Sequence, residues 1–179
     1  MAVFTQISRD PQADPRTGRA FDQLKELLKI VCVTRKSSVT RAGNTAATQT
    51  TLFSYTVPAN ELSNNDSLTF EAAGTFAATA ATDKRIRVKF GSTTIYDSGT
   101  LNITTAESWV LRGTVTRSGA SAQKCDVLIA TSSATLVAKG TYATAAEDLS
   151  ATVLLVITGQ GTNLNDVVGE RFKVIHQPS

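Results

Sequence analysis

The feature that most constrains the fold of this chain is a regular succession of short strand-like segments and turns from Thr51 onward. Within most segments apolar and polar residues alternate, as they do along a strand with one buried face. Clusters of Asn, Asp, Gly and Ser separate the segments, and no helical pattern lies between them. Roughly eight or nine strands at this spacing predict an all-β fold, namely an antiparallel β-sandwich that is jelly-roll-like.

The expected strands differ in how clearly the alternation marks them. Residues 84–90 give the clearest case, because apolar residues alternate with Arg85, Arg87 and Lys89, and Gly91 then begins a tight hairpin turn. Residues 153–157 are apolar on both faces, which predicts a central strand or one that a neighbouring subunit covers. Residues 30–34 are rich in β-branched side chains and are a further candidate strand. From Thr51 onward the expected strands are 51–57, 67–71, 84–90, 93–97, 109–117, 122–131, 135–141, 151–159 and 171–176.

The N-terminal part of the chain differs from the rest. Asp-Pro dipeptides at residues 10–11 and 14–15 favour turns and extended backbone. A short helix is expected at residues 19–29, and it must pack on its own domain or on another chain because about three turns are not stable alone in water. Residues 36–49 are polar and indicate a linker or exposed loop. We therefore divide the chain into an N-terminal arm, residues 1–50, and a sandwich, residues 51–179.

Charge and composition exclude several classes of partner. The hydrophobic share of 41% is enough for a core, and the net charge is only +3. The one dense basic stretch, residues 84–89, is interrupted by apolar residues and indicates a solvated strand face, so we expect no nucleic-acid partner. The longest apolar run is far too short to span a bilayer, and the first ten residues do not resemble a signal peptide. We expect synthesis in the cytoplasm and no membrane partner.

Few residues could carry chemistry. His176 is the only histidine and is expected at a strand end, which disfavours a Ser-His-Asp triad. Glu147 and Asp148 are adjacent and should point apart, unlike the paired carboxylates of a glycosidase. Cys32 and Cys125 lie in strand-like runs and are expected as buried free thiols. We therefore expect no catalytic residue, no cofactor and no metal; a calcium ion held by the turn at residues 64–66 is the one open alternative.

The tryptophan and the tyrosines could lie in the core or form part of a binding surface. Trp109 alternates with Leu111 and Val115, which favours the core over a sugar-stacking surface. The three tyrosines are candidate surface contacts that the pattern does not distinguish: Tyr55, Tyr96 and Tyr142.

Several segments in a fixed order resemble a family of bacteriophage virion domains, the small jelly-roll modules of tail-fibre, head-fibre and capsid-decoration proteins. The resemblance covers about residues 51–160 and rests on the order of the segments together. The segments are FSYTVPAN at 53–60, residues 66–76, KFGSTTIYDS at 89–98, residues 109–119 and YATAAEDL at 142–149. The phrase DPRTGR at residues 14–19 also resembles the start of small phage structural proteins.

The resemblance implies a non-enzymatic virion protein, a homotrimer whose N-terminal segment holds the particle. Its partners would be the major capsid protein or other virion proteins. On this interpretation the chain is a capsid decoration (cement) protein or a short head or tail appendage. Alternatives are a receptor-binding tail-fibre module that recognises host surface glycan and, least favoured, a polysaccharide-degrading enzyme. The residues expected to dock are Pro15, Arg16, Arg19, Phe21, Leu24 and Leu28.

Overall fold

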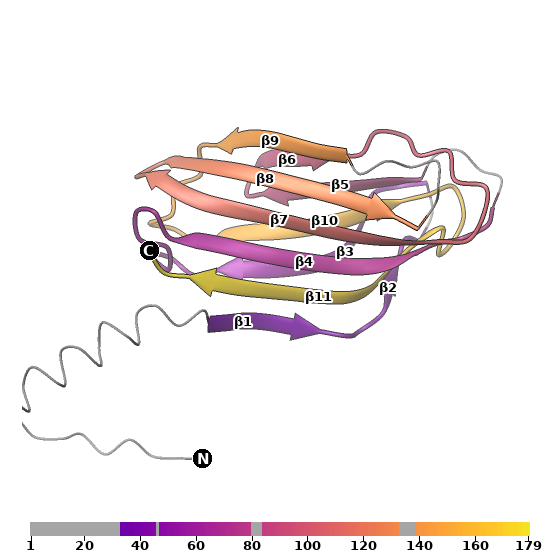
Figure 1. Ribbon diagram of the computed structural model, residues 1–179, viewed down its shortest axis with the longest axis horizontal. Helices are drawn as coiled ribbons and strands as arrows, with labels where there is room; N and C mark the ends of the chain where they lie inside the picture. Colours follow the sequence, from indigo (N-terminus) through magenta and orange to yellow (C-terminus); the bar gives the residue numbers. More distant parts are fainter. Residues whose placement is uncertain (1–32, 46, 80–83, 133–138) are drawn as a thin grey trace, which may run out of the picture. The chain divides into compact units, whose positions relative to one another are not determined.

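The computed structural model describes residues 33–45, 47–79, 84–132 and 139–179 (Figure 1). The chain divides into two units between Val31 and Cys32, and the description below concerns the second. Every regular element in the described residues is a strand. The expected helix at residues 19–29 and all six expected docking residues lie outside the described residues.

The strands form two antiparallel sheets that pack face to face, which confirms the all-β sandwich (Figure 1). Sheet A has the order β1-β11-β4-β7-β8-β9, and β2 pairs with β11. Its strands are β1 (Val33–Ser38), β2 (Ala42–Gly43), β4 (Ser67–Phe76), β7 (Glu107–Gly119), β8 (Ala122–Thr131), β9 (Lys139–Ala145) and β11 (Val167–Gln177). Sheet B has the order β3-β10-β5-β6, with β3 (Thr50–Val57), β5 (Arg85–Phe90), β6 (Thr93–Asp97) and β10 (Val153–Gln160).

The strand order is that of a jelly roll. If β1, β3, β4, β5, β6, β7, β10 and β11 are lettered B to I in chain order, sheet A begins B-I-D-G and sheet B reads C-H-E-F. The β8–β9 hairpin is inserted between the strands lettered G and H. It continues sheet A beyond β7, and its strands contact β6 of sheet B. The expected jelly-roll-like topology is therefore confirmed.

The core lies between the sheets and follows from the alternation along each strand. In β5 the buried residues are Ile86, Val88 and Phe90, as expected from the sequence. The rings of Phe53 in sheet B and Phe172 in sheet A stack with centroids 5.2 Å apart, which joins the two layers. Apolar burial of this kind is the main favourable term in folding.

The sandwich begins earlier than the sequence indicated. The predicted linker at residues 36–49 is wrong for β1 and β2, which pair with β11 upstream of the expected boundary at residue 51. β1 is an edge strand with one neighbour, so little of it is buried. Its residues are therefore mostly polar and exposed, and no alternation marks them as a strand. The expected strand at 135–141 is found as β9 from Lys139 onward, and residues 133–138 lie outside the described residues.

Candidate functional site: sheet B outer face and turn end

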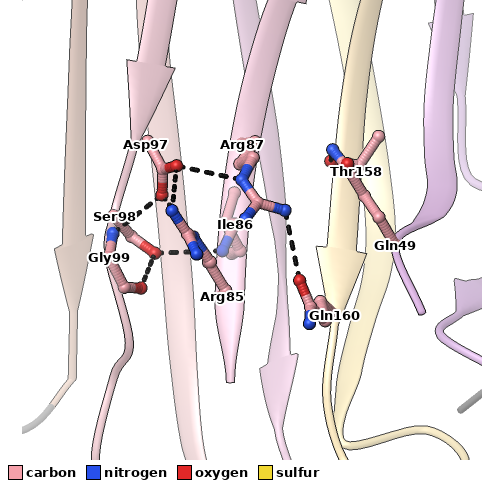
Figure 2. A network of polar contacts seen from close by, with 9 residues as sticks. All are labelled: Gln49, Arg85, Ile86, Arg87, Asp97, Ser98, Gly99, Thr158 and Gln160. Atoms are coloured by element: carbon pink, nitrogen blue, oxygen red, sulfur yellow. Dashed lines mark hydrogen bonds and ion pairs between the residues drawn. The ribbon is translucent and has the colours of Figure 1, made fainter. Parts of the chain in front are cut away.

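The outer face of sheet B carries three cations that follow one strand. The alternation along β5 turns Arg85, Arg87 and Lys89 away from the core. Asp97 on β6 pairs with Arg87 in register, and Gln160 on β10 pairs with Arg85. The side chains of Arg85, Arg87, Asp97 and Gln160 therefore gather on one face (Figure 2).

Asp97 organises this face by accepting hydrogen bonds from both arginines (Figure 2). Arg85 Nε lies 2.6 Å from Asp97 Oδ1, and Arg87 Nε lies 2.9 Å from Oδ2. The backbone N–H of Gly99 donates to the same carboxylate at 2.9 Å. Burial raises the pKa of Asp97, but the bonds from Arg85, Gly99 and Arg87 outweigh it and hold this pKa well below its usual range. Asp97 is therefore charged at any ordinary pH.

Two further side-chain hydrogen bonds lie on this face. Arg87 Nη1 donates to Gln160 Oε1 at 3.1 Å, and Gln49 Nε2 donates to the buried Thr158 hydroxyl at 2.5 Å (Figure 2). Lys89 makes no ion pair with any described residue. The face is therefore mildly basic and polar, with its two arginines fixed by one carboxylate. The expected solvated strand face at residues 84–89 is wrong for Lys84, which is fully buried and donates to the carbonyls of Thr79 and Ile103 at 2.8 and 2.6 Å.

A second candidate region is the turn end, defined here as the β3–β4 loop, the β5–β6 and β7–β8 turns, the β9–β10 loop and the C-terminal residues. Glu147 in the β9–β10 loop caps the β5–β6 turn there. Its Oε1 accepts from the backbone N–H groups of Ser92 and Thr93 at 2.9 and 3.1 Å and from their hydroxyls at 2.8 and 2.9 Å. One carboxylate thus satisfies four donors of the hairpin.

The same loop is tied to two further parts of the turn end. The buried Gln123 side chain donates to the Glu147 carbonyl and accepts from its N–H, both at 2.9 Å. Asn60, with a φ of 59°, donates its backbone N–H to the Leu149 carbonyl at 2.8 Å. The segments around residues 57–60, 91–93 and 147–149 therefore meet in one hydrogen-bonded cluster. No single-strand pattern in the sequence indicates this convergence.

The adjacent carboxylates Glu147 and Asp148 serve different turns. Glu147 is occupied by the hairpin, whereas Asp148 accepts from the backbone N–H of Ser150 at 2.9 Å. They do not face one substrate position, so the geometry gives no support to a glycosidase pair.

Loss of the Glu147 charge should cost stability in a pH-dependent way. Burial raises the pKa of Glu147, but the hydrogen bonds from Ser92 and Thr93 outweigh it and lower this pKa below its unfolded value. A depressed folded pKa contributes stability above the unfolded pKa, and this is lost as the pH falls through the folded pKa. We therefore expect Glu147→Gln to lower the free energy of unfolding by about 1 kcal/mol at pH 7. The difference from wild type should shrink below about pH 4.

Urea unfolding at pH 7 and pH 3.5 measures this effect. Asp126→Asn is the matched control, because Asp126 is an exposed carboxylate on β8, and it should change stability by less than about 0.5 kcal/mol. A Glu147→Gln penalty that stays constant between the two pH values would contradict the charge-based account.

His176 lies buried at the turn end with both ring nitrogens engaged. Nε2 is 3.2 Å from Asp66 Oδ2, and Nδ1 is 2.9 Å from Arg35 Nη2. Neither nitrogen is left to act as a base on a serine, so a triad has no support here. Asp66 also accepts from the N–H groups of Ser63 and Ser179, both at 2.8 Å. The calcium alternative at residues 64–66 is likewise unsupported, because hydrogen-bond donors surround the Asp66 carboxylate. In the described residues, no group of three or more His, Cys, Asp or Glu could hold a metal ion.

The tryptophan, the tyrosines and Cys125 differ in their burial. Trp109 is 1% exposed and belongs to the core, as expected. Tyr96 is buried, Tyr55 donates to Glu61 Oε2 at 2.9 Å, and Tyr142 is 66% exposed. Cys125 is a buried free thiol, and burial with the nearby Asp126 raises its pKa to about 11. Cys32 lies outside the described residues.

One apolar feature, on the outer face of sheet A, was not predicted from the sequence. A shallow depression there is lined by Val110, Arg112, Leu128 and Ala130. These residues occupy outward positions of β7 and β8, and Leu128 is 45% exposed. The sequence contains one sign of this depression, because the expected strands 109–117 and 122–131 carry apolar residues at positions that alternate with the core residues.

No family model matches the chain, and no curated protein matches it. Among the described residues there is no helix with the length and apolar character needed to cross a membrane.

Proposed function

We propose that this chain is a non-enzymatic structural protein of a bacteriophage particle, a trimeric capsid decoration (cement) protein or short head or tail appendage. The observation that carries the proposal is the turn-end cluster. The segments that resemble phage virion modules include residues 57–60, 91–93 and 147–149, and hydrogen bonds join these three. The segments that carry the resemblance are therefore in contact with one another. This supports the interpretation that the chain shares a whole module with the phage proteins, since a chance similarity of separate strands would not favour such contacts.

The position of β1 supports attachment through the N-terminal segment. Val33 pairs with His176, so the described chain begins beside the C-terminal strand at the turn end. Residues 1–32 lead into this strand. In the proposal they dock on the particle, with Pro15, Arg16, Arg19, Phe21, Leu24 and Leu28 as the contact residues. The sandwich is then held outside, and it stabilises the shell by linkage because it binds only the assembled state.

Co-sedimentation with capsids that lack the protein tests this function. The full-length chain should pellet with heads, and a variant lacking residues 1–32 should not. The truncation ends at residue 32 so that β1 stays in sheet A. Circular dichroism of the truncated variant checks that it keeps its strands, and sedimentation equilibrium of the full-length chain should give three times the 19.0 kDa of one chain.

The other outcomes are equally informative. Binding of the truncated, folded variant to heads would contradict the arm as anchor. If neither form binds heads but both bind host cells or surface polysaccharide, the proposal is wrong and the chain is a receptor-binding module. A monomer under all conditions would remove the trimer from the proposal.

A further inference from the structure

His176 lies between a cation on β1 and a carboxylate in the β3–β4 loop. The Arg35 guanidinium donates from Nη2 to a ring nitrogen, Nδ1, at 2.9 Å. Arginine stays protonated and has no acceptor, so Nδ1 must be the acceptor and Nε2 must carry the hydrogen that faces Asp66. The arrangement therefore requires a neutral imidazole with one defined tautomer.

The two partners of His176 differ in how firmly they are held. Asp66 is buried and accepts from the backbone N–H groups of Ser63 and Ser179. Burial raises the pKa of Asp66, but these bonds and the one from His176 outweigh it and lower this pKa, so the carboxylate stays charged in mild acid. The Arg35 side chain is 34% exposed and can move toward solvent. A change at His176 would therefore displace Arg35 before Asp66.

Strand β1 depends on few contacts besides its ladder with β11. It is an edge strand, and its register with β11 is irregular between Thr34 and Lys36. Within the described residues, the side-chain bonds that tie β1 to other elements come from two residues. Arg35 contacts His176 and pairs with Glu61 Oε1 at 2.5 Å, and Lys36 Nζ donates to the Ser54 carbonyl at 2.8 Å.

We propose that protonation of His176 releases Arg35 and loosens β1. The contacts of Arg35 with His176 and of His176 with Asp66, called the clasp below, would then hold β1 in a pH-dependent way. Strand β1 is the strand that leads into the N-terminal segment. A proton on Nδ1 replaces the acceptor with an N–H donor that faces the donors of a guanidinium of the same charge. The contact between His176 and Asp66 survives, because its hydrogen bond becomes charge-assisted. The proton therefore acts on β1 and leaves the rest of the turn end in place.

The other charged and titratable groups near the His176 ring determine which contacts Arg35 can make after its release. Glu61 holds the second side of Arg35, and Tyr55 donates to Glu61, so this carboxylate retains or guides the released side chain. Burial, with Glu61, raises the pKa of Tyr55 to about 12, so the phenol stays protonated. Arg117 of β7 is occupied by the carbonyls of Leu62 and Gly119. Histidine is the side chain among these whose charge ordinarily changes in mild acid.

Hydrogen exchange measured by NMR on the full-length protein tests the clasp. The imidazole signals need no assignment, because His176 is the only histidine. We compare pH 7.5 with pH 5.5 and follow the imidazole signals at both; protonation of His176 should lower the protection factors of the β1 amides by about tenfold, because one hydrogen bond to a charged group is lost. The amides of β4 and β7 should keep their protection.

Two variants connect the loss to the named contact. His176→Gln removes the titrating group and should abolish the pH dependence of β1 protection. Arg35→Gln should lower β1 protection already at pH 7.5, with no further loss at pH 5.5. The proposal is overturned if His176 does not protonate by pH 5.5, if it protonates while β1 protection is unchanged, if all strands lose protection equally, or if His176→Gln keeps the wild-type pH dependence.

Discussion

Asn44→Ala is expected to destabilise the sandwich by about 3–4 kcal/mol, because this one side chain closes the loop between β10 and β11. Asn44 is fully buried. Its Nδ2 donates to the carbonyls of Gly161 and Asn163 at 3.2 and 2.8 Å, and its Oδ1 accepts from the Val167 N–H at 2.8 Å. Alanine leaves the Gly161 carbonyl and the Val167 N–H without this side-chain partner, whereas the Asn163 carbonyl keeps the bond from the Asp166 N–H at 3.3 Å. An unsatisfied buried group costs about 1–3 kcal/mol.

Thermal and urea unfolding measure the Asn44 effect. For a chain of this size we expect the melting temperature to fall by roughly 10 °C. Asn102→Ala is the matched control, since Asn102 is exposed in the β6–β7 loop, and it should change stability by less than about 0.5 kcal/mol. An Asn44→Ala variant as stable as this control would show that water or other groups satisfy the loop.

Asn44 also shows where sequence reasoning stops. Strands from Thr51 onward could be predicted because alternation marks a buried face, and β5, β6 and β8 were found with nearly the observed bounds. Asn44 sits in a polar stretch without alternation, and its partners are backbone groups more than a hundred residues away. A side chain that bonds distant backbone leaves no periodic trace in a single sequence.

The turn end was predictable only in part. The hairpin at Gly91 was expected, and Gly91 adopts a φ of 58° there. That Glu147 caps this hairpin could not be predicted, because the contact joins loops from different parts of the chain. His176 was expected at a strand end, but its two partners come from an edge strand and a loop. The clusters around Glu147 and His176 both depend on segments that meet only in the folded chain. The patterns in a single sequence carry no information about such contacts.

Trp109→Ala is expected to cost about 3–5 kcal/mol, in the range of large-to-small substitutions that leave a cavity. Trp109 is 1% exposed on the inner face of β7, and its ring lies 6.3 Å from that of Phe76 between centroids. Gly74 on β4 is opposite, and a Cβ there would lie 2.7 Å from Trp109 Cζ2, so the indole fills the space that glycine leaves. Removing the indole empties this part of the core, which a rigid β-sandwich refills only partly.

Two matched variants separate core packing from a surface role of Trp109. Trp109→Phe keeps an aromatic ring and should cost less than about 1.5 kcal/mol, since the indole Nε1 has no hydrogen-bond partner among the described residues. Tyr142→Ala removes an aromatic that is 66% exposed and should change stability by less than about 0.5 kcal/mol. The measurement is urea unfolding followed by circular dichroism. If Trp109→Ala were as mild as Tyr142→Ala, Trp109 would belong to an accessible surface and a role in sugar stacking would have to be reconsidered.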